Sequence, residues 1–189
     1  GIKDFQRSLS IASSLNFEYM ILDNLRLTES LQYTRGTART EKFLPADHTS
    51  FANETDKTLK GSYSKNTGES TSWSSNLGLN YNLPIEKHLI SMLANWTVSE
   101  DRNNYVNLFA TGYPDRHMDD FIFGNKMSTN PSGSESLSRA MSFIGQVSYS
   151  YDNRYSFDFN LSEENSSRYA NNSFTPFWST GVRWNAYRE

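Results

Sequence analysis

Cysteine is absent from the 189 residues of the chain, so neither a disulfide framework nor a cysteine-based zinc site can exist. No run approaches the roughly 18 consecutive apolar residues that a transmembrane helix requires. No signal peptide is visible either. The chain begins at Gly1 without a methionine, and we expect it to be a fragment of a longer protein.

The charge balance and the histidines exclude further classes of function. The net charge of −3 gives no general attraction to nucleic acid. The three histidines are scattered, without a spacing such as HExxH, and no glycine-rich phosphate loop is present. His117 and the aspartates at 115, 119 and 120 could offer metal ligands, but a solvated acidic loop is the favoured interpretation. We therefore predict no enzyme, no metal, no cofactor and no nucleic-acid partner.

The chain is rich in aromatic residues and yet polar on average. It has eleven tyrosines and twelve phenylalanines, while its mean hydropathy is −0.69. Strands with one apolar and one polar face produce this combination, because successive side chains point to opposite faces.

The clearest such pattern lies in residues 146–169. Its apolar members, on either side of a tight turn at 152–154, are Val147, Tyr149, Tyr151, Tyr155, Phe157, Phe159 and Leu161. Serine, asparagine and aspartate occupy the alternate positions. This period of two predicts a β-hairpin with one apolar face.

Similar alternation recurs through most of the chain. Strands are predicted at about 6–21, 25–34, 72–83, 88–98, 138–151, 155–162 and 174–187, and residues 59–65 could extend one of them before a bend at 66–68. Pro114 could open one or two helical turns. The predicted fold is all-β: an antiparallel up-and-down meander of about seven long strands, forming one barrel segment over residues 1–189.

The connections between these strands alternate in length. Short turns at 22–24, 84–87 and 152–154 contrast with long loops at about 37–58, 99–137 and 163–173. Aromatic residues gather beside the short turns, and a second set lies eight to ten residues further along several strands. Two aromatic girdles around an apolar band, with short turns at one end, are typical of a transmembrane β-barrel. A soluble β-sandwich, whose apolar face is core, is the alternative.

The long loops contain aromatic residues that could contact a ligand or a partner. They are Phe43, Phe51, Tyr105, Phe109, Tyr113 and Phe121. Such rings can stack on sugars or touch another protein, and they can equally form small local cores that hold the loops down.

A set of motifs resembles the SusC/RagA type of TonB-dependent outer-membrane transporter. The matching residues are Tyr151, Arg154 and Tyr155, then Ser166, Ser167 and Arg168, then Pro176 and Gly181. These resemble the family's Y-x-Y-x-x-R-Y, D-G-S-S-R-F-G and F-P-S-x-S-x-G-W segments. The chain departs from them at Glu164-Asn165, where Asp-Gly is usual, and at Val182, which stands in the place of tryptophan.

The resemblance implies a location, a function and partners. Such proteins are barrels of about 22 strands closed by a plug, and they import glycans or peptides across the bacterial outer membrane. A SusD-like lid lipoprotein usually covers them, and TonB supplies energy. This chain has neither a plug nor a TonB box, so we expect a wall segment in contact with lipid, the plug and the remaining strands. A soluble extracellular carbohydrate-binding β-sandwich remains the alternative function. The isolated segment is expected to self-associate through its apolar rows and unpaired edges.

Overall fold

The computed structural model describes residues 2–127, 129–167 and 175–188. Its strands are β1 (Lys3–Leu22), β2 (Leu25–Leu44), β3 (Ser62–Ile85), β4 (His88–Thr111), β5 (Lys126–Met127), β6 (Ser132–Tyr151), β7 (Tyr155–Ser166) and β8 (Thr175–Trp184). Three short 3-10 helices complete it: η1 (Thr49–Phe51), η2 (Phe121–Phe123) and η3 (Ala186–Arg188). No helix of the described part of the chain is long and apolar enough to cross a membrane.

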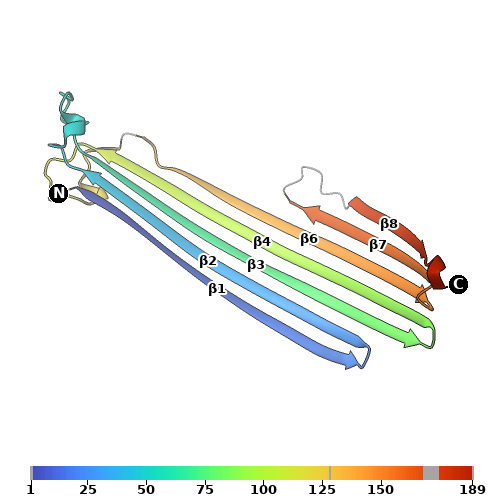
Figure 1. Ribbon diagram of the computed structural model, residues 1–189. Coiled ribbons are helices and arrows are strands. Elements are labelled where there is room, and N and C mark those ends of the chain that lie inside the picture. The colour runs from blue at the N-terminus through green and yellow to red at the C-terminus, as the bar shows by residue number, and fades with distance from the viewer. Residues whose placement is uncertain (1, 128, 168–174, 189) are drawn as a thin grey trace. The chain divides into compact units, whose positions relative to one another are not determined.

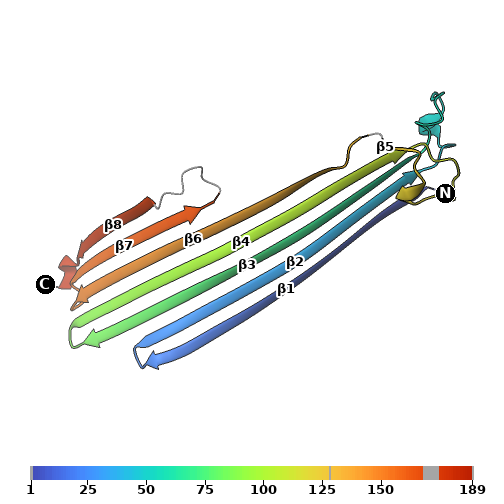
Figure 2. The ribbon, with the colours of Figure 1, turned by 180° about the vertical axis from the view of Figure 1, so that it is seen from behind.

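All the strands belong to one sheet. Their order is β1-β2-β3-β4-β6-β7-β8 (Figure 1), and the two-residue β5 pairs with β4. Each long strand therefore lies beside its neighbour in the sequence, as Figure 2 shows from behind. The predicted all-β antiparallel meander is confirmed, and β1 and β8 stand at the ends of the strand order.

The chain divides into two compact units. Unit 1 comprises residues 1–11, 34–71 and 102–136, and unit 2 comprises residues 12–33, 72–101 and 137–189. Strands β1 to β4 each run from one unit into the other. Unit 2 contains the short connections after β1, β3 and β6, and unit 1 contains the long connections after β2 and β4.

The predicted boundaries of the long loops were wrong. The structure extends β2 to Leu44, starts β3 at Ser62, extends β4 to Thr111 and starts β6 at Ser132. Residues 66–68 continue β3 without a bend, and β7 continues to Ser166. The strands continue because backbone hydrogen bonding does not require an apolar face. The rest of the predicted loop 163–173 and the predicted strand start at Phe174 lie mostly outside the described residues.

Two other local predictions were also wrong. No helical turn opens at Pro114; the helical segment of this connection is η2, where the Asp120 side chain accepts from the backbone N–H of Ile122. The last strand ends at Trp184 rather than at 187, and η3 follows it.

The hairpin turns use left-handed backbone conformations. Glu86 has φ 50°, and Asp152 and Asn153 have φ 48° and 54°. Aspartate and asparagine tolerate this region better than other non-glycine residues. The turn at 152–154 therefore closes tightly enough to pair Tyr151 with Tyr155.

Gly112 allows the two long connections of unit 1 to approach each other. Its φ is 79°, and an added Cβ would lie 2.9 Å from both the Thr58 carbonyl oxygen and the Asn125 Cβ. Replacing Gly112 with alanine should therefore destabilise unit 1 by about 1–3 kcal/mol.

Hydrogen exchange of the amides at 45–61 and 112–125, in the full-length protein, would measure this loss. Gly181→Ala is the matched control, because a Cβ there meets nothing within 4 Å. Equal protection in the two variants would show that close approach at Gly112 is not required.

Candidate functional site

The sheet has two chemically distinct faces, and contacts across several strand pairs assign residues to them. A Cβ on Gly78 would touch the Thr28 hydroxyl, and one on Gly36 would touch the Ser70 hydroxyl. Even-numbered residues of β2 and β3 therefore share one face, which is polar. We call it the polar face and its opposite the apolar face.

The register of the C-terminal strands continues this division. Val147 pairs with Phe159 on the apolar face, and Ser148 pairs with Asp158 on the polar face. Leu161 then pairs with Trp178 on the apolar face. The alternation predicted for this hairpin is confirmed.

The apolar face of unit 2 is uncovered. Leu79 is 38% exposed and Trp178 is 64% exposed, although both belong to the regular centre of a strand. Other large exposed side chains of this unit are Leu15, Phe17, Tyr19, Leu31, Tyr33, Trp73, Leu77, Met92, Trp96, Phe143, Phe157 and Val182. Exposed apolar surface on this scale marks a contact with lipid or with another protein.

One carboxylate interrupts the apolar row on β2. Glu29 lies between Leu27 and Leu31 and accepts a hydrogen bond of 2.7 Å from the Ser75 hydroxyl on β3. This bond satisfies one lone pair of the carboxylate and fixes its direction along the sheet.

The polar face of unit 2 is crossed by side-chain hydrogen bonds. The Ser148 hydroxyl donates to Asp158, and the Asn160 amide donates to the Ser179 hydroxyl at 3.4 Å. Arg26 pairs with Glu18 at 3.5 Å. Hydroxyls, amides and paired charges are compatible with a wet surface.

In unit 1, the polar face has a groove of about 440 Å³ across four strands. Gly36, Ala38, Gly68 and Ser70 form part of its floor, so backbone and very small side chains leave the space. Tyr105 on β4 borders it and is 44% exposed. The groove therefore combines an exposed ring, hydroxyls and amides with a floor that a ligand can approach closely.

The other face of unit 1 has a small aromatic core. Phe43, Tyr63 and Tyr113 are almost completely buried together with Ala110, and Phe121 packs against them. The rings of Phe43 and Tyr113 meet edge to face at 5.2 Å between centroids. Tyr113 also donates to the Phe121 carbonyl at 3.3 Å. Burial raises the pKa of Tyr113 to about 12.

Glu41 is a charged member of this core. It is 3% exposed and makes ion pairs with Lys3, at 3.1 Å, and with Arg39. Burial by itself would raise its pKa, but its hydrogen bonds with Arg39, Lys3 and Tyr63 outweigh burial and lower the pKa to about 2. Through these contacts Glu41 joins β1, β2 and β3 near Lys3, the first residue of β1.

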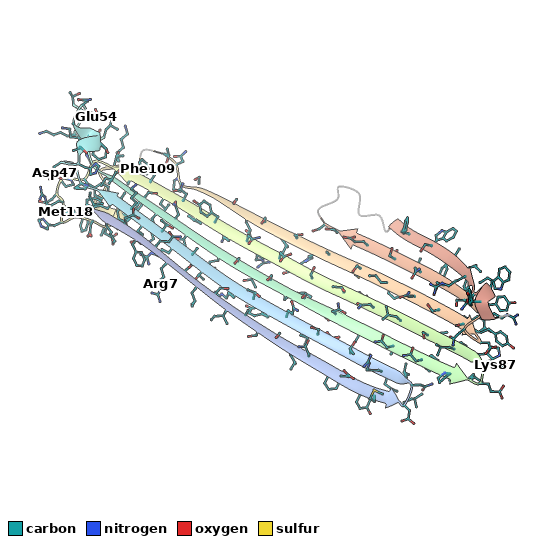
Figure 3. The ribbon with its side chains drawn as sticks, in the orientation of Figure 1. Arg7, Asp47, Glu54, Lys87, Phe109 and Met118 are labelled. Atoms are coloured by element: carbon teal, nitrogen blue, oxygen red, sulfur yellow. The ribbon has the colours of Figure 1, made fainter. Side chains whose placement is uncertain are left out.

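Backbone contacts join the two long connections of unit 1. Gly112 and Tyr113 donate to the Lys60 carbonyl at 3.1 and 3.0 Å, and the Thr111 hydroxyl donates to the Thr58 carbonyl at 2.9 Å. Asp47 pairs with Arg116, and Figure 3 shows Asp47 and Met118 at the same end of the strands. The connections are therefore built as one ordered platform.

The structure separates the predicted loop aromatics into three groups. Phe43 and Tyr113 lie in the buried core, as expected if these rings form a local core that holds the loops in place. Tyr105 and Phe109 lie within β4 rather than in a loop, and Phe51 ends η1. Among them, Tyr105 presents an exposed ring to a groove. A contact of any of these rings with a ligand or a partner stays a prediction.

The family-signature residues form two local groups. Tyr151, Arg154 and Tyr155 meet at the β6/β7 turn, where the Arg154 guanidinium lies 5.6 Å from the Tyr155 ring centroid. Further along, the amide of Ser167 donates to the Arg139 carbonyl and its hydroxyl accepts from the Arg139 amide.

The other signature residues continue along the C-terminal strands. Ser166 is buried at the end of β7. Pro176 pairs with Glu163 and Gly181 with Asp158. Arg168 lies outside the described residues.

The acidic residues around His117 do not assemble a metal site in the described residues. The His117 ring and backbone amide both contact the Asp115 carboxylate at 2.8 Å. These hydrogen bonds lower the pKa of Asp115, and they hold a loop turn in solvent.

Sequence reasoning missed Glu41 as a structural centre. The available signal was its position between Arg39 and Phe43, where a basic, an acidic and an aromatic residue share one face of a strand. Its partners Lys3 and Tyr63 are far from Glu41 in the sequence, so a local pattern does not reveal these contacts.

Replacing Glu41 with glutamine should destabilise unit 1 by about 1–3 kcal/mol, because two cationic partners lose the negative charge and one of the two accepting oxygens of the buried carboxylate. The lowered pKa also sets a pH dependence. The stabilisation is present above the ordinary glutamate pKa of 4.5 and is lost as pH falls toward about 2.

Hydrogen exchange of β2 and β3 amides between pH 5 and pH 2.5 would measure both effects. Glu18→Gln is the control, because Glu18 pairs with Arg26 while exposed. An acid sensitivity of unit 1 that persists unchanged in Glu41→Gln would contradict this assignment.

No family model and no curated protein sequence matches the chain. Solved structures do match. That of the RagAB peptide transporter covers the whole chain with a TM-score of 0.82 and 16% identity, and the chain spans 21% of its length. The RagAB peptide importer in its closed-closed state gives a TM-score of 0.83 and 18% identity, again over the whole chain and 21% of its length. The ferric preacinetobactin receptor BauA from Acinetobacter baumannii gives 0.50 and 13%, covering 94% of this chain and 27% of that one.

The fold of the chain is therefore similar to that of about a fifth of the RagAB transporter chain. The resemblance to the SusC/RagA type, inferred from the motifs, is confirmed at the level of fold by the RagAB structures.

Proposed function

We propose that the chain forms part of the barrel wall of a nutrient importer in the bacterial outer membrane, with no catalytic role. The observation that supports this most is the uncovered apolar face of unit 2. Leu77 and Leu79 are about two-fifths exposed at the centre of β3. In the soluble sandwich alternative a second sheet would cover them, and the described residues form a single sheet.

The dimensions of the apolar face fit a bilayer. From Trp73 to Tyr81 on β3, and from His88 to Trp96 on β4, the spacing is eight residues. Such a segment is about 27 Å long and, at a tilt of about 40°, spans about 20 Å of membrane. This is close to the apolar band of about 25 Å between the aromatic girdles of known barrels.

Charged side chains begin where this band ends. On the apolar face, Arg35 follows Tyr33 by two residues, and Glu100 follows Trp96 by four. Arg139 on β6 bonds Glu100 at 2.7 Å. We infer that unit 2 crosses the membrane, since about 9–11 residues suffice for one crossing.

The polar face then lines the lumen. We propose that the groove beside Tyr105 contacts the imported solute, a glycan or a peptide. The groove faces the interior, and its small floor residues permit close approach. The plug and further strands of a closed barrel would complete the lumen.

The platform of the two long connections is the proposed contact for a SusD-like lid, while TonB would supply energy to the complete protein. Support comes from side chains that the platform leaves exposed: Met118, Ile122 and Phe123. Ile122 is 77% exposed although it lies within η2. Apolar groups on an ordered surface are suited to binding a partner.

The facing of β3 gives the first test. In the full-length barrel, Leu79→Arg should destabilise by roughly 2–4 kcal/mol, the usual cost of a lipid-facing arginine near mid-bilayer. Asn80→Arg should cost much less, because a wet lumen solvates the guanidinium.

A lipophilic quencher acting on a probe at either position separates lipid from a protein core. Quenching is expected at 79 and not at 80. Quenching at neither position would favour the soluble sandwich, and quenching only at 80 would reverse the assignment of faces.

The groove gives a second test. Tyr105→Ala should reduce solute uptake several-fold without loss of folded barrel, because it removes the exposed ring and leaves the backbone pairing. Tyr33→Ala is the control, as it removes a similarly exposed ring from the apolar face. Unchanged uptake by the Tyr105 variant would remove the groove from the solute path.

A further inference from the structure

Basic side chains gather on the apolar-face side of unit 1, where the apolar row has ended. Alternation along β1 to β4 places six of them on this face: Lys3, Arg7, Arg35, Arg39, Lys65 and Arg102. Contacts fix the face at several points. Lys3 and Arg39 both bond Glu41, and Glu41 lies beside the buried Tyr63 in the aromatic core.

The local charge is opposite to that of the chain. Within the unit 1 stretches of these four strands, the carboxylates of this face are Glu41 and Glu69, and Glu100 follows on β4 two residues from Arg102. Glu41 is already bound by two of the basic groups. A net positive face in a chain of net charge −3 is a segregated surface rather than an average one.

Arg7 and Arg35, on the neighbouring strands β1 and β2, are members of this set that do not bond Glu41, as are Lys65 and Arg102. Arg7 and Arg35 are both exposed, and in the described part of the chain neither makes an ion pair. Figure 3 shows Arg7 projecting from β1. Because Lys3 pairs with Glu41, antiparallel pairing brings Arg7 opposite the 35–39 stretch of β2.

The positions of Arg7 and Arg35 along their strands determine which molecules these side chains can contact. Arg35 lies two residues beyond Tyr33, the last aromatic side chain of the apolar row on β2. If unit 2 crosses the bilayer, as proposed above, this is the level of lipid headgroups. The solute groove lies on the opposite face, so these arginines do not line it.

We propose that Arg7 and Arg35 bind the phosphate groups of a phosphorylated glycolipid in the outer leaflet. A guanidinium presents paired donors that match a phosphate geometrically. Basic residues at a membrane surface attract anionic headgroups electrostatically. Arg39 and Lys3, which are held by Glu41, support the site through their charge.

Binding of lipid A by the full-length protein in detergent tests the site. Diphosphorylated and dephosphorylated lipid A would be compared by thermophoresis at low salt. The Arg7→Gln/Arg35→Gln variant should bind the diphosphorylated form on the order of tenfold more weakly. Its affinity for the dephosphorylated form should stay unchanged.

The matched control is Arg26→Gln/Arg183→Gln, which removes two charges from the polar face. It should leave both affinities unchanged. Equal affinities of the two variants for diphosphorylated lipid A would overturn the proposal. The proposal would also be overturned if inorganic phosphate, at the concentration of the lipid phosphates, displaced the lipid equally well, because that would indicate a site for a free anion.

The quenching experiment at residues 79 and 80 separates this inference from the proposed function. Quenching at 79 without phosphate-dependent lipid binding would remove only the headgroup site. Absence of quenching at both positions would remove the membrane wall and the headgroup site together.

Discussion

Pairing of every strand with its neighbour in the sequence is the constraint on which the rest of this structure depends. A meander satisfies backbone N–H and C=O groups between strands, so the side chains are not needed to form a central core. Each face can then take the chemistry of its surroundings. In unit 2 one face is apolar and uncovered, and the other is crossed by hydrogen bonds such as that from Ser148 to Asp158.

Unit 1 uses the same backbone ladder differently. Its strands have polar residues on both faces, and it gains a small core where the long connection after β4 folds against Phe43 and Tyr63. Glu41 adds ion pairs to Lys3 and Arg39 at the edge of that core. The two long connections are thereby fixed to the strands as one ordered platform.

The sequence predicted the fold class and the strand order well, because apolar alternation is strong in unit 2. The predicted ends near residues 34 and 98 mark where the alternation stops, and the strands themselves continue to Leu44 and Thr111. Residues such as Tyr105 and Phe109 were assigned to a loop for that reason. The Glu41 cluster could not be predicted, since it depends on contacts between residues 3, 41 and 63 that only strand pairing brings together. The residues Tyr151, Arg154 and Tyr155 of the motif lie together because one hairpin turn contains all three.

A nitroxide scan along β3 of the reconstituted full-length protein tests the central claim most directly. Spin labels placed singly from residue 69 to residue 82 would be compared for accessibility to oxygen, which concentrates in lipid, and to a water-soluble nickel complex. The account predicts high oxygen accessibility at odd positions from 73 to 81, high nickel accessibility at even positions, and loss of the oxygen preference at 69 and 71. Protection of the odd positions from both reagents would show that protein rather than lipid covers the apolar face, and would contradict the account.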